Sequence, residues 1–179
     1  MKRVSALLLL GLALLGAGVC RAAPPTEYQL KAAFLLNFAR YIEWPVAKLG
    51  AGAPISICVL GRDPFGGALV AYDGRQAQGH EVRVRAVDTV EHAGDCHVLF
   101  VTESEERRVA SILRSAAGKS VLTVSDIDGF AEAGGAVGLF SDDDRVRFDI
   151  NLWTLQRDGL KASSHLLRLG RNIIGSKAP

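Results

Sequence analysis

The sequence predicts an α/β fold: a single three-layer domain with a mostly parallel mixed sheet, helices on both faces and a C-terminal β-hairpin. Apolar runs of strand length alternate with helical segments over the first two-thirds of the chain, which is typical of a parallel sheet. Near the end, two strand-like segments are separated by Ser-Asp-Asp-Asp, which indicates a hairpin. The 179 residues, 49% hydrophobic and 22% charged, fit one folded domain.

The first residues do not belong to this domain. Lys2 and Arg3 precede an uncharged run of 17 residues that ends at Cys20, and small residues follow at the position of a cleavage site. This order is that of a secretory signal. We therefore assign residues 1–22 to a cleaved signal peptide, with cleavage after Ala22 or one residue later, and residues 24–179 to the exported domain.

Two alternatives to a cleaved signal remain. A membrane anchor is one, although the uncharged run is shorter than the ~20 residues that a span needs. A lipoprotein modified at Cys20 is the other, although Val19 is larger than the residue usually found there.

Without the signal the chain keeps 18 basic and 19 acidic residues. This balance gives no general electrostatic reason to expect binding to nucleic acid or to an anionic membrane.

The exported domain keeps two cysteines, Cys58 and Cys96. Exported proteins fold in an oxidising compartment, so we expect these two to form a disulfide. The bond would close a loop of nearly forty residues and stabilise the fold by about 3–4 kcal/mol. Two buried free thiols are the alternative.

The domain opens with a predicted helix over residues 27–44. Thr26 and Gln29 have the spacing of a capping box, and Pro45 is expected to end the helix. Trp44 lies at the helix end and is the one aromatic residue expected at a surface or pocket. The apolar residues expected to face the core are Leu30, Phe34, Leu35, Phe38, Tyr41 and Ile42.

Further elements follow from apolar periodicity and turn residues. The predicted strands are 55–60, 81–87, 96–102 and 120–124, and the hairpin strands are 135–140 and 145–151. The predicted helices are 64–71, 103–117, 152–157 and 163–173.

The loop GRDPFGG, which follows the first strand, raises the question of a phosphate-binding loop. It lacks the Lys-Ser/Thr pair of a P-loop, and the chain has no lysine between Lys48 and Lys119. The dinucleotide fingerprint is also missing. Asp63 is expected to cap the following helix, and its charge would repel a phosphate. We therefore expect an ordinary strand-to-helix turn.

No pattern indicates catalysis or metal binding. The four histidines, His80, His92, His97 and His165, form no pair four residues apart and no zinc motif. His97 is expected to be a strand residue without a special role. The three aspartates at 142–144 lack calcium-loop spacing, and no nucleophile motif occurs. We expect no enzyme activity, no cofactor and no metal.

The segment RVRFDIN is the best candidate for a binding site. In a strand, Arg145, Arg147 and Asp149 share one face. Two neighbouring arginines near Asn151 could hold an acidic ligand or partner. Alternatively, the arginines form a solvated strand face paired with the aspartates of the turn.

Six segments in this order resemble the YfiR family of exported bacterial proteins, over residues 27–173. They are LKAAFLLNFARYIEWP, ICVLGRDPFG, DCHVLFVTESE, SVLTVSDIDGFAEAGGAVGLF, RVRFDINLWTLQRDGL and SSHLLRLGRNI.

The resemblance implies a periplasmic homodimer that binds the periplasmic sensor region of an inner-membrane diguanylate cyclase. It would hold the cyclase inactive, lower cyclic di-GMP and restrain biofilm growth. The alternative is a periplasmic small-molecule sensor for another membrane receptor, such as a histidine kinase. Cys58 and Cys96 match family cysteines, whereas the later pair of some relatives is missing here.

The resemblance also implies a small-molecule site near the Arg-x-Arg-Phe strand. The candidates for ligand or partner binding are Arg40, Trp44, Arg145, Arg147 and Asn151.

Overall fold

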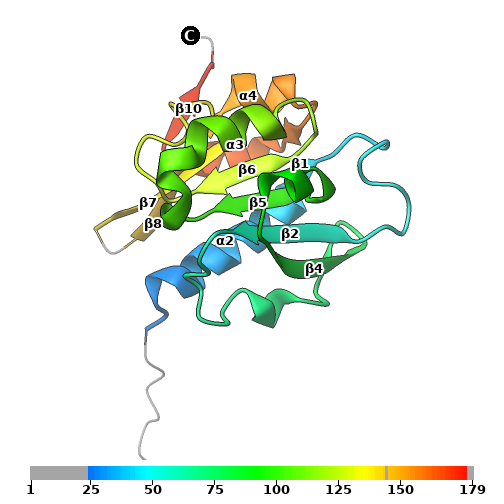
Figure 1. The fold of residues 1–179 in the computed structure, drawn as a ribbon, viewed down its shortest axis with the longest axis horizontal. Coiled ribbons are helices and arrows are strands. Elements are labelled where there is room, and N and C mark those ends of the chain that lie inside the picture. Colours follow the sequence, from blue (N-terminus) through cyan, green and yellow to red (C-terminus); the bar gives the residue numbers. More distant parts are fainter. Residues whose placement is uncertain (1–23, 144, 177–179) are drawn as a thin grey trace, which may run out of the picture.

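The computed structural model describes residues 24–143 and 145–176, so the predicted signal peptide and its cleavage site lie outside the described residues. The described chain forms an eight-stranded mixed sheet in the order β10-β8-β7-β6-β5-β2-β4-β3 (Figure 1). Its strands are β2 (Ile55–Leu60), β3 (Gln76–Ala77), β4 (His80–Val87), β5 (Val98–Val101), β6 (Leu122–Ser125), β7 (Val137–Asp142), β8 (Arg145–Asn151) and β10 (Asn172–Ile174).

The middle of the sheet is parallel. Strands β4, β2, β5, β6 and β7 run in one direction, and β8 returns antiparallel to β7 as the predicted hairpin. After β2 the chain forms β4, which pairs with one edge of β2. It then returns to form β5, which pairs with the other edge of β2. The carboxyl ends of β2 and β5 therefore flank the point where the strand order reverses, which is where open α/β sheets usually bind ligands.

Helices cover both faces of the sheet, which confirms the three layers. In Figure 1, α3 (Val109–Ala116) lies in front of the sheet and α2 (Glu27–Tyr41) lies behind it. The core behind the sheet joins α2 to residues such as Ile57, Phe100 and Phe148. The core in front joins Ile112 of α3 to Leu99 and to both cysteines.

Helix α2 begins as predicted and ends earlier. Thr26 forms the capping box with Gln29. The helix stops at Tyr41 because Ile42–Glu43 becomes the short strand β1, which pairs with β9 (Lys161–Ala162). The buried face consists of Lys31, Ala32, Leu35, Leu36, Phe38 and Ala39. The expected aromatic face is thus only partly correct, since Leu30, Phe34 and Tyr41 are half-buried.

The predicted helix 64–71 is wrong. The segment consists of turns and a short 3-10 helix, Val70–Tyr72. Gly66 and Gly67 have φ of 56° and 90°, which an α-helix does not accept. Asp63 does not cap a helix: its Oδ1 accepts a hydrogen bond from the amide of Phe65 two residues later, as in an Asx turn.

The other differences are at element ends. The predicted helix 103–117 begins as a 3-10 helix, Glu103–Arg108, before α3. Helix α4 (Leu152–Arg157) matches its prediction. The last predicted helix ends at Leu169 as α5 (Ser164–Leu169), and the following residues form β10 parallel to β8 at the sheet edge.

Candidate functional site

The two cysteines form the predicted disulfide. Cys58 lies within β2, and Cys96 lies two residues before β5, the neighbouring parallel strand. Their sulfurs are 2.00 Å apart, their Cα atoms 5.9 Å apart, and both residues are fully buried. The bond therefore fastens the start of β5 to the centre of the sheet, on the α3 side of the core.

His97, next to the disulfide, has a role that the sequence did not reveal. Its Nδ1 accepts a hydrogen bond from the amide of Ser56 at 3.0 Å, so its Nε2 carries the hydrogen and donates to the carbonyl of Lys48 at 3.2 Å. The ring of Trp44 packs edge-on against it. Burial lowers the pKa of His97, and a neutral imidazole thus joins β2 to the loop before it.

The arginine strand has the predicted arrangement of faces. Arg147 is exposed and its Nε lies 3.0 Å from Oδ2 of Asp142, on the neighbouring strand. Asp149 is buried and accepts two hydrogen bonds from Arg171, at 3.1 and 2.6 Å. The guanidinium of Arg171 also lies 3.8 Å from the ring centre of Phe140. Arg147 thus pairs with an aspartate of the hairpin, which was the alternative that the sequence left open.

Both arginines of β8 nevertheless border a small pocket. It has a volume of about 240 Å³, and apolar side chains line most of it. They include Phe34 of α2 and Leu169 of α5, whose side chain is 58% exposed. Two arginine residues that border an open apolar pocket suit a ligand or partner that combines an acidic group with an apolar one.

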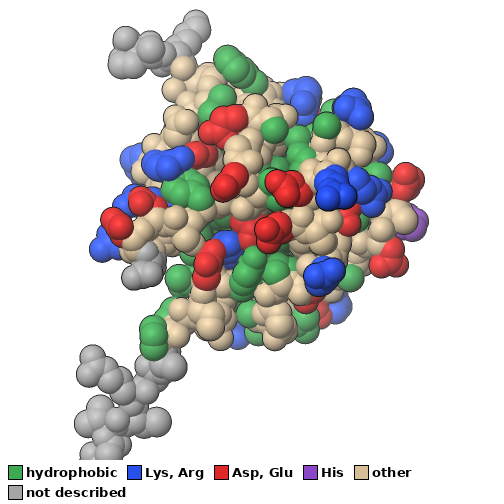
Figure 2. Space-filling model, turned by 60° about the vertical axis from the view of Figure 1, so that its left-hand side comes forward, with side chains coloured by type: hydrophobic (Ala, Val, Ile, Leu, Met, Phe, Trp, Pro, Cys, Tyr) green, Lys and Arg blue, Asp and Glu red, His purple; other side chains and the backbone are tan. Residues whose placement is uncertain are grey.

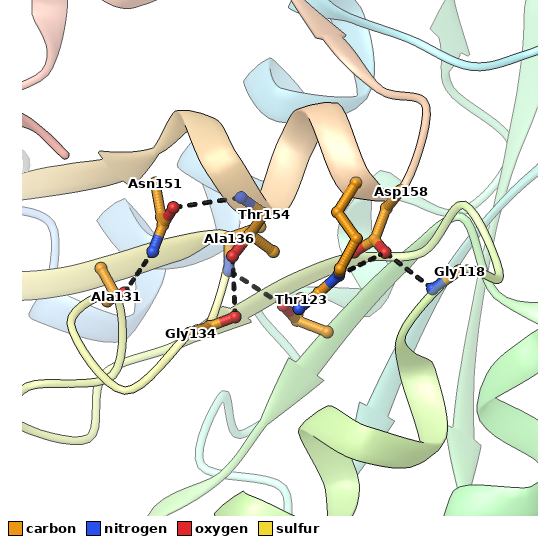
Figure 3. A network of polar contacts seen from close by, with 9 residues as sticks. Gly118, Thr123, Ala131, Gly134, Ala136, Asn151, Thr154 and Asp158 are labelled. Carbon is orange, nitrogen blue, oxygen red and sulfur yellow. Dashed lines mark hydrogen bonds and ion pairs between the residues drawn. The ribbon is translucent and has the colours of Figure 1, made fainter. Parts of the chain in front are cut away.

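Asn151 has a structural role. Its Oδ1 accepts a hydrogen bond from the amide of Thr154, which caps α4, and its Nδ2 donates to the carbonyl of Ala131 (Figure 3). Thr154 in turn donates to Gly134. Asn151 is 5% exposed and is fully engaged in holding the loop 126–136 against α4.

The remaining candidates lie apart from the arginine strand. Arg40 is exposed near the end of α2 and contacts Asn37. Trp44 is buried against His97, contrary to the expected surface position. Among the described residues, no hydrogen bond or ion pair joins Arg40 to Arg145 or Arg147. The pocket thus includes the two β8 arginines and none of the other three candidates.

The sequence model of the YfiR/HmsC-like family matches residues 28–171. The chain belongs to this family. The match runs from the first turn of α2 to the residue before β10, and so includes the disulfide and the arginine strand.

The YfiR/HmsC-like family is a family of periplasmic regulatory proteins. Within residues 24–143 and 145–176, no helix has the length and apolar character needed to cross a membrane.

Two solved structures are similar to the chain at low sequence identity, and the first of them shares its fold. A conserved domain protein from Vibrio cholerae O1 biovar El Tor is 10% identical, with a TM-score of 0.52 over 84% of this chain. The ABC domain in complex with L-Trp from Streptococcus pneumonia is 12% identical, with a TM-score of 0.49 over 67% of this chain. This YfiR/HmsC-like chain spans 61% and 55% of their respective lengths.

The glycine-rich loop of this YfiR/HmsC-like protein is fixed to the neighbouring loop. Gly61 has a φ of 98°, and a Cβ there would lie 2.2 Å from Oγ1 of Thr102. Thr102 donates to the carbonyl of Leu60, and Ser104 accepts from the amide of Arg62. The glycine thus permits a close approach between the loops after β2 and β5, with no phosphate required.

A buried ion pair at the start of α2 was not predicted from the sequence. Lys31 of α2 lies 2.6 Å from Asp126, in the loop after β6, and 2.6 Å from Glu27. Tyr28 also donates to Asp126 at 3.0 Å. A lysine within the apolar stripe of a helix was the one available signal, since Lys31, Leu35 and Phe38 share a face.

Proposed function

We propose that this YfiR/HmsC-like protein is a homodimeric periplasmic repressor of an inner-membrane diguanylate cyclase. It would bind the periplasmic sensor region of the cyclase and lower cyclic di-GMP. The observation that carries the proposal is the family match across residues 28–171, which covers nearly all of the described domain. The synthesis of cyclic di-GMP would take place on the cyclase, so this chain needs only a surface that binds the cyclase.

The surface that we assign to ligand or partner binding consists of Arg145, Arg147, Phe34 and Leu169 around the 240 Å³ pocket. Leu169 is 58% exposed and offers apolar area, and arginine is enriched among the residues that contribute most to protein interfaces. Arg147 already faces Asp142, so an acidic group on the partner would compete with this exposed ion pair. Such pairs contribute only ~1 kcal/mol or less, so the exchange is feasible.

The experiment measures cellular cyclic di-GMP in a strain that lacks the gene. We expect a rise on deletion, reversed by the exported protein but not by a version without residues 1–22. The variant Arg145→Ala/Arg147→Ala should fail to restore the low level. The matched control is Arg107→Ala/Arg114→Ala, because these arginines are exposed in the 3-10 segment before α3 and in α3 itself. An unchanged level on deletion would contradict the repressor role, and full complementation by the β8 variant would contradict the assigned surface.

A further inference from the structure

The loop of residues 44–54, which joins β1 to β2, projects from the right-hand side of the molecule (cyan in Figure 1). Two histidine side chains attach it to the sheet. His97, just before β5, binds the carbonyl of Lys48, and His80, at the start of β4, binds the carbonyl of Ala53. Titratable side chains thus hold the loop at its middle and near its end.

The two histidines use their ring nitrogens differently. His97 accepts a hydrogen bond from the amide of Ser56 at Nδ1 and donates from Nε2 to Lys48, so it needs the neutral ring. A protonated ring carries hydrogen on both nitrogens, and the bond from Ser56 would be lost. His80 only donates, from Nδ1 to the carbonyl of Ala53 at 2.6 Å. Protonation of His80 leaves its bond to the loop intact.

The surroundings of His97 oppose a positive charge. The residue is 6% exposed, and the ring of Trp44 packs edge-on against it with the ring centres 5.7 Å apart. Burial lowers the pKa of His97 most, and the charges of Lys48, His80 and Arg85 lower it further.

Positive charges exceed negative ones around His97. Burial, together with repulsion from Arg85 and Lys119, outweighs the attraction of Asp95 and lowers the pKa of Lys48 as well. Acidic side chains gather instead around a hollow in the face that Figure 2 brings forward, which is on the left in Figure 1, away from the loop. A proton on His97 would therefore add to a local excess of positive charge.

The closed position of the loop depends on the neutral form of one buried ring. We propose that residues 44–54 form an acid-released strap, which is fastened to the sheet while His97 is neutral and opens when His97 is protonated. The bond at Ala53 persists and acts as the hinge. Opening uncovers the ring of Trp44 and the half-buried Leu49, both of which pack against the core in the closed form.

Acid shifts the balance between the closed and the open strap. In the open form His97 is in water, with a pKa near its ordinary value of about 6.5, whereas the closed form holds the pKa lower. The ratio of open to closed molecules therefore rises as the pH falls below about 6.5, by up to about tenfold for each pH unit. The release is independent of the proposed repression, because it occurs within one chain.

The experiment uses the fluorescence of Trp44. The chain has two tryptophans, so in the disulfide-bonded variant Trp153→Phe the emission comes from Trp44 alone. Trp153 is 65% exposed, and its replacement should leave the core unchanged. Between pH 7.5 and pH 4.5 we expect the emission to move to longer wavelength and acrylamide to quench it more, while far-UV circular dichroism stays constant.

Three results of this titration would overturn the proposal. An unchanged emission would mean that the strap stays closed. A loss of intensity without a wavelength shift would mean that His97 is protonated inside the closed loop. A simultaneous loss of the circular dichroism signal would mean that the whole fold opens.

The variant His97→Gln, made in the Trp153→Phe background, should abolish the shift, because glutamine stays neutral at every pH tested. The matched control is His92→Gln, since His92 is exposed in the neighbouring 3-10 helix Val90–Asp95. It should keep the shift. A shift that persists in His97→Gln, or that is lost equally in His92→Gln, would contradict the assignment to His97.

Hydrogen exchange of the unmodified protein tests the strap without a variant. The amide of Ser56 donates to His97, whereas the amide of Thr102 donates to the carbonyl of Leu60 at the other end of β2. Relative to the intrinsic exchange rate at each pH, the protection of Ser56 should fall by up to about tenfold per pH unit below 6.5, while that of Thr102 stays constant. Constant protection at Ser56, or an equal loss at both amides, would overturn the proposal.

Discussion

The ammonium of Lys31 lies 2.6 Å from Oδ2 of Asp126, although the two residues are 95 positions apart. Both side chains are more than nine-tenths buried. The pair therefore fixes the second turn of α2 to the loop at the carboxyl end of β6. Glu27 and Tyr28 complete the arrangement from the first turn of the same helix.

Removal of one partner of this ion pair should destabilise the fold strongly. We expect Lys31→Met to lower the free energy of unfolding by about 3–5 kcal/mol, because Asp126 then stays buried without a counter-charge. The double variant Lys31→Met/Asp126→Leu should recover much of that loss. Urea unfolding measures both, with the exposed Lys161→Met as a control. A double variant no more stable than the single one would contradict the ion-pair account.

The same pair should affect stability at alkaline pH. Burial favours the neutral amine, but the hydrogen bonds to Asp126 and Glu27 outweigh it, so the pKa of Lys31 lies above its ordinary value. Its contribution is thus complete below the unfolded value of about 10.4 and is lost as the pH rises through the folded value. We expect the unmodified protein to lose more stability than the double variant across this range. Parallel profiles would argue against the raised pKa.

The disulfide should contribute much of the thermal stability. The bond spans 38 positions, and its loss should lower the free energy of unfolding by about 3–4 kcal/mol, or roughly 6–15 °C in melting temperature. Calorimetry of Cys58→Ala/Cys96→Ala measures the effect. Because both cysteines are fully buried, a mild reductant should act slowly on the folded protein and not at all on the variant. Equal melting temperatures for both proteins would exclude a stabilising role.

The sequence predicted those parts of the fold that local patterns determine. Apolar runs located β2 and β5, the acidic turn located the hairpin, and Thr26 marked the start of α2. The helix at 64–71 failed because Pro64 and Asp63 favour a helix start, whereas Gly66 and Gly67 adopt left-handed conformations that end it.

The candidate site was harder to predict because it depends on contacts between distant residues. Strand alternation correctly placed Arg145 and Arg147 on one face, but it could not show that Asn151 is used to cap α4. The buried pair of Lys31 and Asp126 joins α2 to the loop after β6, and no spacing in the sequence predicts a contact between residues so far apart. Only the lysine in the apolar face of α2 indicated a buried charge.

Substitutions of Asn151 and Arg147 should distinguish a structural residue from a candidate binding residue. We expect Asn151→Ala to cost about 1–3 kcal/mol, because α4 loses its cap and the carbonyl of Ala131 loses a donor. Arg147→Ala should change stability by less than ~1 kcal/mol, since its ion pair is exposed. Ser163→Ala, which removes only the cap of α5, is the comparison for Asn151. Unfolding in urea gives all three values, and a neutral Asn151→Ala would contradict the structural role.

His97 should make the fold sensitive to mild acid. Burial is the main cause of its lowered pKa, and the positive charges of Lys48 and Arg85 act in the same direction. The unfolded chain therefore binds a proton at a pH where the folded chain does not. The contribution of the neutral ring is complete above the unfolded value of about 6.5 and is lost as the pH falls toward the folded value, with a slope of up to about 1.4 kcal/mol per pH unit.

The variant His97→Gln removes this titration. It should be less stable than the unmodified protein at pH 8, because the bonds to Ser56 and Lys48 are disturbed, but its stability should fall less steeply below pH 6.5. His92→Gln is the matched control, because His92 is exposed, and should keep the steep profile. Melting temperatures recorded between pH 8 and pH 4.5 give the pH dependence of stability for the three proteins. Equal slopes for His97→Gln and the unmodified protein would mean that another group controls the acid sensitivity, because the buried imidazole would then titrate alike in the folded and unfolded chains.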